Sequence, residues 1–394
     1  MIVMKHLEDL NYKGKTVFLR VDFNVPLEEN GNIRNDTRIK ASLPTINYLI
    51  DQGAKLVIAS HLGRPKGKVD PKLSLKPAAK RLSELVSADV FMAPDCVGPD
   101  VARLKKELKP KQVLVLENVR FHAGETANDA GFAQKLAQGI DCYVNDAFGS
   151  CHRAHASVEA IAKYVKEKAA GYLLEKEVKY LSQAIHSPKK PYVAILGGAK
   201  VSDKIDIIQN LLNKANDILI GGAMAYTFFK AQGFEVGKSL VEDDKLEIAR
   251  KILTKAKEKK VEFYLPLDHL LATGIDKNAQ TKLADAFPFP PGWMAVDIGP
   301  KTVAEYSKTI ALAKTIFWNG PLGVFEIDKF ARGTLKIAEA VAAAKAVSIV
   351  GGGDSIAAVQ KAGVSDKITH ISTGGGAALE YLANETLPGI EALE

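Results

Sequence analysis

Short apolar runs, many of them rich in β-branched residues, alternate along the chain with longer segments of helical periodicity. The apolar runs cover residues 16–21, 55–60, 112–116, 142–145, 192–196, 217–221, 262–265, 315–318 and 346–350. Helical periodicity is clearest at residues 36–52, 74–87, 202–215, 243–259 and 331–345. This alternation predicts an α/β fold built from crossover units. Because the strands are apolar throughout, we expect parallel sheets with helices on both faces.

One strongly helical segment marks a domain boundary. Residues 172–186 have helical periodicity, and the proline-containing residues 187–191 stop the helix before a new strand begins at Tyr192. A chain of 394 residues is also long for one domain. We therefore predict two doubly wound (Rossmann-like) parallel-sheet domains joined by a long hinge helix. The expected parts are residues 1–170, the hinge helix 171–187, residues 188–378 and a tail of residues 379–394.

Composition predicts an ordinary cytoplasmic protein. Hydrophobic residues make up 47% of the chain and charged residues 25%, as in most globular proteins. No apolar run reaches eighteen residues, and the first residues do not resemble a signal peptide, so we expect no membrane partner. The three cysteines, Cys96, Cys142 and Cys151, lack metal-ligand spacing and are expected to be reduced thiols.

The net charge of +7 and the pI of about 9.0 favour a polyanionic partner. Nucleic-acid binding usually needs basic clusters interleaved with aromatic residues. The lysine-rich stretches, such as residues 255–260, lie in helical patterns without aromatic residues and are typical of solvated helix faces. We therefore expect a small anionic substrate and no nucleic acid.

A glycine loop near the C-terminal end suggests phosphate binding. An apolar run stops at Val350, and three glycines, Asp354 and Ser355 precede a helical pattern. A strand, a glycine loop and a helix N-terminus present backbone N–H groups to a phosphate. The same residues also suit a tight turn with a capped helix, and Asp354 suits either an N-cap or a Mg²⁺ ligand. The loop lacks the G-x-G-x-x-G pattern that a NAD-dependent dehydrogenase requires.

Further glycine loops follow other strands of the C-terminal half. Lys200 and Lys204 follow Gly197 and Gly198, and residues 221–226 and 372–382 repeat the strand-to-glycine transition. Several such loops around one sheet favour a nucleotide cleft. Glu326, after the strand at 315–318, suits either ribose hydroxyls or a solvated loop position.

Cationic and polar residues follow successive strands of the N-terminal half. Ligands of open parallel sheets bind beyond the carboxyl ends of the strands, so these residues should meet at one edge. Guanidinium groups bind phosphate and carboxylate through paired hydrogen bonds, which suits a small anion carrying both groups. The residues concerned are Asp22, Asn24, Arg38, His61, Arg64, Arg120 and Arg153.

Nine motifs carry a resemblance to a known family. They read VDFNVPL, DTRIKASLPTI, SHLGRPKG, LENVRF, NDAFGSCHRAHAS, GGAKVSDKI, WNGPLGVFE, GGGDS and STGGGA. In this order, from residue 17 to residue 378, they resemble the phosphoglycerate kinase family, and the length resembles its bacterial-type members. The resemblance implies reversible phosphoryl transfer from 1,3-bisphosphoglycerate to Mg-ADP, giving 3-phosphoglycerate and ATP. It also implies that the N-terminal domain binds phosphoglycerate and the C-terminal domain binds the nucleotide.

The resemblance also implies a role for individual residues. On the substrate side, Asp22 and Asn24 would hold the hydroxyl and the carboxylate, Arg38 would lie at the transferred group, and the non-transferring phosphate would be bound by His61, Arg64, Arg120 and Arg153. On the nucleotide side, Lys200 would stabilise the transferred phosphoryl group, Lys204 would reach the nucleotide phosphates, Asp354 would carry Mg²⁺ and Glu326 would bind the ribose. The phosphate path would be lined by Gly352, Gly353, Ser355, Gly374 and Gly375, of which Gly352 and Gly375 are expected to be catalytic.

Two residues depart from the family pattern. Many relatives have Gly at the position of Ala295, on the adenine side of the nucleotide site, and Ser at the position of Ala378. Neither position carries charge, so we expect both to affect affinity and not the reaction. A catalytically inactive nucleotide-binding regulatory protein of the same fold is the alternative, but the presence of both Arg38 and Lys200 argues against it.

Family members are usually monomers whose last residues return to the N-terminal domain, and we expect both features here. The carboxylate nucleophile is already ionised at neutral pH, so no general base is needed. We expect domain closure and electrostatic stabilisation to carry catalysis.

Overall fold

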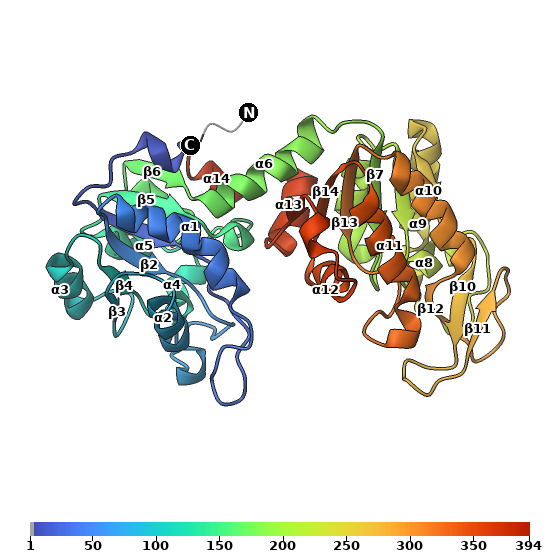
Figure 1. The fold of residues 1–394 in the computed structure, drawn as a ribbon, viewed down its shortest axis with the longest axis horizontal. Coiled ribbons are helices and arrows are strands. Elements are labelled where there is room, and N and C mark those ends of the chain that lie inside the picture. The colour runs from blue at the N-terminus through green and yellow to red at the C-terminus, as the bar shows by residue number, and fades with distance from the viewer. Residues whose placement is uncertain (1–3) are drawn as a thin grey trace. The chain divides into compact units, whose positions relative to one another are not determined.

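The computed structural model describes residues 4–394 of the chain and forms two compact units (Figure 1). The first unit extends to Lys179 and also contains Thr386–Glu394, and the second is Tyr180–Glu385. Helix α6, Tyr172–His186, crosses from one unit to the other. Both units are built on six-stranded parallel sheets, and the predicted α/β fold is confirmed.

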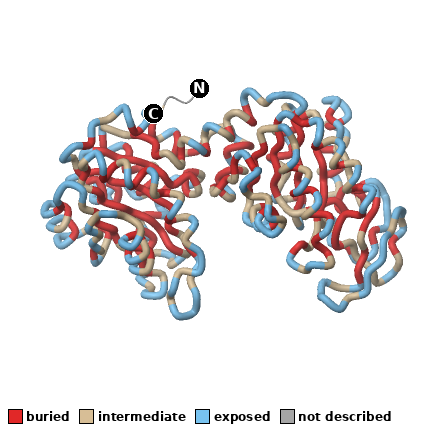
Figure 2. The backbone as a smooth tube through the Cα atoms, in the orientation of Figure 1, coloured by how far each residue is buried: buried red, intermediate tan, exposed pale blue. Residues whose placement is uncertain are grey.

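The first unit contains a sheet in the order β3-β4-β2-β1-β5-β6. The strands are β1 Thr16–Arg20, β2 Lys55–Ala59, β3 Val90–Met92, β4 Val113–Val115, β5 Cys142–Asn145 and β6 Glu167–Ala170. The helices that alternate with them are α1 Thr37–Asp51, α2 Lys76–Ser83, α3 Pro99–Glu107, α4 Ala123–Thr126 and α5 Ala130–Ala137. Every residue of β1 and β5 is buried, as the continuous apolar runs predict (Figure 2).

The second unit repeats this plan with the order β15-β14-β13-β7-β8-β9. Its strands are β7 Tyr192–Leu196, β8 Asp217–Ile220, β9 Glu262–Tyr264, β13 Thr315–Asn319, β14 Val347–Gly351 and β15 His370–Ile371. Its helices are α7 Ile205–Leu211, α8 Met224–Ala231, α9 Leu246–Lys259, α10 Pro300–Leu312, α11 Arg332–Ala343, α12 Gly353–Lys361 and α13 Gly376–Asn384. Val193, Ile195, Ile316, Trp318 and Val350 meet in its core.

The order of strands reverses beside the central strand of each sheet. Successive strands are added on one side of β1 and β7, and the later strands β5 and β13 pair on the opposite side. A crevice opens at the carboxyl ends of the strands where such a reversal occurs. Both candidate sites follow from this topology, because the loops after β1, β5, β7 and β13 contain identified residues such as Asp22, Arg153, Lys200 and Glu326. Most of the other identified residues follow the neighbouring strands β2, β4, β14 and β15 or, like Arg38, begin the next helix.

Sequence patterns missed several strands. The strands β10 His269–Ala272, β11 Thr281–Ala284 and β12 Met294–Ile298 form an antiparallel sheet in the order β11-β10-β12. Its strand β11 is mostly exposed and contains no apolar run. Strands β3, β6 and β15 were also missed, because they are two to four residues long and β6 reads Glu-Lys-Ala-Ala. The expected helix at 202–215 begins as a 3₁₀ turn, η6 Ser202–Lys204, before α7.

The two halves of α6 are anchored in different units. In the first unit, Asp146 Oδ1 accepts hydrogen bonds from the N–H groups of Leu173 and Leu174, at 2.9 and 3.3 Å. In the second unit, Tyr180 stacks on His370 with ring centroids 4.7 Å apart. Carboxylates at a helix N-terminus satisfy N–H groups that have no partner within the helix.

The last residues belong to the first unit, and this segment starts at Thr386, since α13 is part of the second unit. Gly389 N donates to Cys151 O at 2.9 Å, and Lys168 Nζ donates to Ala392 O at 2.9 Å. The short helix α14, Pro388–Glu391, lies in this segment. No helix among residues 4–394 is long and apolar enough to cross a bilayer.

Replacing Asp146 by Asn should change how the stability of the first unit depends on pH. Burial raises the pKa of Asp146 from 3.8 to about 7, although the N–H groups of α6 oppose this shift. Between these pH values the folded state binds a proton that the unfolded chain has released, so this carboxyl lowers stability as the pH rises from about 4 to about 7. The side chain of Asp146→Asn cannot ionise. Between about pH 4 and pH 7, the free energy of unfolding of this variant should therefore decrease by roughly 1–3 kcal/mol less than that of the parent chain.

Urea unfolding followed by far-ultraviolet circular dichroism at several pH values measures the effect. Both tryptophans, Trp293 and Trp318, lie in the second unit, so their fluorescence provides an internal reference. The exposed Asp51→Asn is the matched control. Equal pH slopes for the parent chain, Asp146→Asn and Asp51→Asn would show that Asp146 is ionised throughout this range.

Candidate functional site

A cationic cluster lies at the carboxyl ends of β1, β2 and β5 in the first unit. Asp22 follows β1 and accepts a hydrogen bond from Arg38 Nη1 of α1 at 2.6 Å. Burial alone would raise the pKa of the Asp22 carboxyl, but the surrounding positive groups and the Asn24 N–H lower it below its usual value. The ion pair therefore holds Arg38 beside the crevice, with about 37% of its side chain exposed.

Arg20 belongs to this cluster, and the sequence analysis missed it. The residue is fully buried at the end of β1. Its Nε donates to Ser157 Oγ at 2.8 Å, its Nη1 donates to Val21 O, and its Nη2 lies 3.2 Å from His61 Nδ1. Arg20 could have been identified from the sequence, because it is a charged residue inside the apolar run 16–21. A guanidinium buried in a strand requires polar partners, which are commonly found at a site. No carboxylate of the described chain forms an ion pair with Arg20 at short range, so its charge adds to the field of the cluster.

The histidines of the cluster are held neutral by their surroundings. Burial, followed by the nearby arginines, lowers the pKa of His61 well below its usual value and that of His155 to about 4. Burial and Arg153 also lower the pKa of His152. The same causes, burial first, lower the pKa of Arg120 to about 10. The positive charge of the cluster therefore comes from guanidinium groups, and it lacks enough acidic partners to balance it.

The backbone of Gly63 connects other predicted residues to the cluster. Asn24 Oδ1 accepts from Gly63 N at 2.9 Å, and Arg120 Nη1 donates to Gly63 O at 2.8 Å. Arg64 is the next residue and is exposed. Arg153 is also exposed and donates through Nε to His152 Nε2 at 3.0 Å. The structure thus brings Asp22, Asn24, Arg38, His61 and Arg120 together and leaves the side chains of Arg64 and Arg153 at the surface.

In the second unit, the loops after β7 and β13 touch at the reversal of strand order. A Cβ on Gly197 would lie 2.1 Å from Pro321 O, and one on Gly320 would lie 2.2 Å from Gly197 O. Only glycine permits this approach. Next to the contact is a cavity of about 430 Å³, and the predicted residues that line it are Lys200, Lys204, Gly352, Gly353, Asp354, Ser355 and Gly375.

The N-terminus of α12 faces this cavity. Ser355 is buried, and its Oγ accepts a hydrogen bond from Gly320 N at 2.6 Å, which ties the start of α12 to the β13 loop. A Cβ on Gly353 or Gly375 would meet nothing within 4 Å, so the backbone faces open space there. Free N–H groups at a helix N-terminus form a phosphate site.

Lys204 lies beside these N–H groups and is mostly buried. Its Nζ donates to Asn319 Oδ1. Burial lowers the pKa of Lys204 to about 8, while Asp203 and Asp354 oppose the shift. An ammonium group that has lost its contacts with water is stabilised strongly by a nearby anion. The position therefore suits an ionised phosphate, which would favour the charged form of the lysine.

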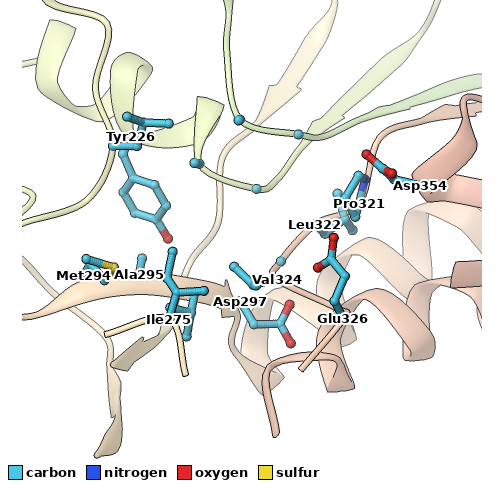
Figure 3. A pocket seen from close by; sticks show the side chains of 17 residues that line it. Tyr226, Ile275, Met294, Ala295, Asp297, Pro321, Leu322, Val324, Glu326 and Asp354 are labelled. Atoms are coloured by element: carbon cyan, nitrogen blue, oxygen red, sulfur yellow. The ribbon is translucent and has the colours of Figure 1, made fainter. Parts of the chain in front are cut away.

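A second cavity of about 290 Å³ adjoins the first, and Asp354 lines both (Figure 3). Ala295 and Glu326 line it, as does an apolar wall that includes Ile275, Met294 and Val324. Glu326 is exposed, and Figure 3 shows its carboxylate on the same side of the pocket as Asp354. An apolar slot beside a phosphate site is the arrangement of a nucleotide pocket.

Two polar residues of this second cavity were missed by the sequence analysis. Tyr226 of α8 directs its hydroxyl to His269 Nδ1 at 2.9 Å. Asp297 of β12 is buried and accepts hydrogen bonds from Gly333 N and Ile298 N at 2.6 and 2.9 Å. Burial raises the pKa of Asp297 to about 7 despite these bonds. Tyr226 ends the glycine segment 221–226, whose pattern points to its glycines and not to the tyrosine, and Asp297 lies in neither a glycine loop nor a charged motif.

Two doubly wound sheets, one with an arginine-rich anion site and the other with a phosphate loop beside an apolar slot, are typical of two-domain α/β phosphotransferases. Comparison with known proteins then gives the family. The model of the family described as phosphoglycerate kinase matches residues 7–385. The chain belongs to the phosphoglycerate kinase family.

Individual relatives are similar to the chain over nearly their full length. The chain is 58% identical over 396 residues to a phosphoglycerate kinase of Acidobacterium capsulatum, with 98% of each chain covered. It is 54% identical to that of Anaeromyxobacter sp. strain K, with 100% of each covered. The solved structure of phosphoglycerate kinase from Coxiella burnetii has a TM-score of 0.90 and 42% identity, with 99% of this chain and 98% of that chain covered. The structure from Pyrococcus horikoshii gives 0.85 and 38%, with the same coverage.

Ser355→Ala should destabilise the second unit. The change leaves the partly buried Gly320 N–H without an acceptor, which costs about 1–3 kcal/mol. Tryptophan fluorescence during urea unfolding reports on this unit alone, because both tryptophans are in it. The exposed Ser187→Ala, in the same unit, is the control and should change stability by less than about 0.5 kcal/mol. A loss for Ser355→Ala no larger than for Ser187→Ala would mean that water replaces the hydroxyl.

Proposed function

We propose that this chain catalyses the reversible transfer of the acyl phosphate of 1,3-bisphosphoglycerate to Mg-ADP, giving 3-phosphoglycerate and ATP. The family is one of phosphotransferases that use a carboxyl group as acceptor, and the chain is a kinase of this glycolytic class. The observation that carries the proposal is the arginine cluster, which has more positive charge than its acidic residues balance and suits a phosphorylated carboxylate. An inactive nucleotide-binding protein would not need this cluster.

The first unit would bind the phosphoglycerate. Its carboxylate has a pKa of about 3.5 to 4 and is ionised at neutral pH, so the nucleophile needs no base. This agrees with histidines that are neutral and buried rather than poised to move protons. Asp22 and Asn24 would orient the hydroxyl and carboxylate, Arg38 would face the transferred group, and the other phosphate would be bound by His61, Arg64, Arg120 and Arg153.

The second unit would bind the nucleotide. The apolar slot beside Ala295 would take the base, and Glu326 would accept from the ribose hydroxyls. The phosphates would lie along Gly352, Gly353, Ser355 and Gly375, where α12 presents its N–H groups and Lys204 adds charge. Lys200 would stabilise the transferred phosphoryl group, whose equatorial oxygens carry charge in the transition state.

Asp354 fits a Mg²⁺ ion that arrives with the nucleotide. Its carboxylate is exposed, lines both cavities, and has no hydrogen bond or ion pair with the described chain. Mg²⁺ is commonly held by one or two carboxylates together with substrate phosphates. When bound, the ion would neutralise phosphate charge during transfer.

Transfer requires the two ligands to meet, although each binds to a different unit. We propose that α6, whose two halves are anchored in different units, acts as the hinge for closure. We also propose a cytoplasmic monomer without nucleic-acid partners. The free thiols of Cys96, Cys142 and Cys151 agree with a reducing compartment.

Trapping of the acyl phosphate tests the function directly. The protein is incubated with 3-phosphoglycerate, ATP and Mg²⁺, and hydroxylamine converts the acyl phosphate into hydroxamate. Hydroxamate should form only when both substrates and Mg²⁺ are present. If the folded protein forms no hydroxamate, the proposed activity is wrong, and the alternative of a catalytically inactive nucleotide-binding protein is favoured.

Arg38→Ala should lower kcat by roughly 10² to 10⁴. The variant loses a positive charge that stabilises the transition state, and the reaction has no general base that could contribute to the rate. Steady-state kinetics measure the change. The control is Arg34→Ala, an exposed arginine that precedes the same helix, which should keep the parent kcat. Arg38→Lys separates charge from the paired geometry of the guanidinium. A kcat for Arg38→Ala within about threefold of the parent would remove Arg38 from catalysis.

A further inference from the structure

A second group of metal-ligating side chains lies in the first unit, outside the proposed substrate and nucleotide sites. Asp95 and Cys96 follow β3, and His122 follows the turn η3 Val119–Phe121 after β4. Their ligand atoms all lie within 4.8 Å of one another, and no other such group of three occurs among residues 4–394. Strands β3 and β4 are neighbours in the sheet, which brings the two loops together.

The three side chains are already held close to a ligating geometry. His122 Nε2 lies 2.5 Å from Asp95 Oδ1, and the same oxygen accepts from Cys96 N at 2.6 Å. The His122 ring stacks on Phe132 with centroids 4.8 Å apart and an angle of 25°, which fixes the direction of Nε2. Cys96 Sγ donates to Glu117 O at 2.9 Å and is buried. Little reorganisation would be needed to receive an ion.

The donor set selects the kind of ion. Thiolate and imidazole favour Zn²⁺ over Mg²⁺ or Ca²⁺, which prefer oxygen ligands. In a tetrahedral zinc site the donor atoms are roughly 3.3–3.8 Å apart. The most distant pair of donor atoms therefore needs to approach by no more than about 1.5 Å, and His122 Nε2 and Asp95 Oδ1 need to separate by roughly 1 Å. His122 also lines a surface cavity of about 430 Å³, and Asp95 is half exposed, which provides an entry path and room for water.

We propose that Asp95, Cys96 and His122 form a Zn²⁺ site whose fourth position is open to water. Zn²⁺ replaces the thiol proton of Cys96, which is released to solvent, and His122 binds through Nε2 as the neutral tautomer that carries its proton on Nδ1. The site fastens the loop after β3 to the loop after β4. Because η3 also contains Arg120, the metal holds the segment that presents Arg120 to the cationic cluster.

Metal binding to the intact protein tests the proposal. After chelator treatment, Zn²⁺ is added without nucleotide and with an excess of Mg²⁺, which occupies oxygen-rich sites. Equilibrium dialysis with elemental analysis should find one Zn²⁺ per chain. Asp95→Asn, Cys96→Ser and His122→Gln should each weaken binding at least about tenfold. Co²⁺ in place of Zn²⁺ should give a thiolate charge-transfer band that Cys96→Ser abolishes.

Cys142→Ser is the matched control. Cys142 is also a buried thiol beside a carboxylate, Glu167 at 3.1 Å, but it belongs to no group of three ligands in the described chain. This variant should keep full Zn²⁺ affinity and the Co²⁺ band. Circular dichroism of the metal-free variants checks that they fold. If Cys96→Ser does not fold, Asp95→Asn still tests the site, because its side chain is half exposed and the substitution leaves the core unchanged. Absence of bound Zn²⁺ in the parent, or equal binding by Asp95→Asn, His122→Gln and the parent, would overturn the proposal.

Discussion

Both candidate sites depend on the reversal of strand order beside the central strand of each sheet. Chain connections leave β1 and β5, and likewise β7 and β13, in opposite directions, so the loops at their carboxyl ends enclose a crevice. In the second unit this crevice is narrow enough for Gly197 and Pro321 to touch. Glycines at this contact and the buried hydroxyl of Ser355 then determine where the N-terminus of α12 points. The topology thus fixes the place of binding, and the loops fix its chemistry.

The first unit keeps unbalanced positive charge in a partly buried crevice. Arg20 has no access to water and Arg120 little, yet the acidic residues close to the cluster are Asp22, paired with Arg38, and the buried Glu125, beside His155. Such burial costs free energy in the absence of a ligand. An anion with two charged groups would offset much of this cost, so this local loss of stability would favour binding of the proposed substrate. The buried guanidinium of Arg20 also orients His61, which places one neutral donor at a defined position.

Sequence patterns predicted the parts of the molecule whose chemistry is local. Apolar runs located the long central strands, and strand-end motifs located Asp22, Arg38, Lys200 and Asp354. The remaining parts depend on contacts between distant segments. Asp297 is held in the pocket by a hydrogen bond from Gly333 N at the start of α11, and Tyr226 by its contact with His269, and neither partner is close in sequence. Likewise, β3, β6 and β15 are short strands whose pairing is decided by longer neighbours and not by their own residues.

The proposed role of the cluster in phosphoryl transfer would explain why its charge comes from arginine and not from histidine. A transition state that carries charge on phosphoryl oxygens needs donors that stay charged wherever the enzyme works. Guanidinium groups meet this need, since even Arg120, with a pKa lowered to about 10, remains protonated at neutral pH. His61 and His155 have become neutral under the same burial and the same arginines. With the carboxylate nucleophile of the proposed reaction, the loss of charge on these histidines would not slow transfer, because no proton has to be removed before the carboxylate attacks.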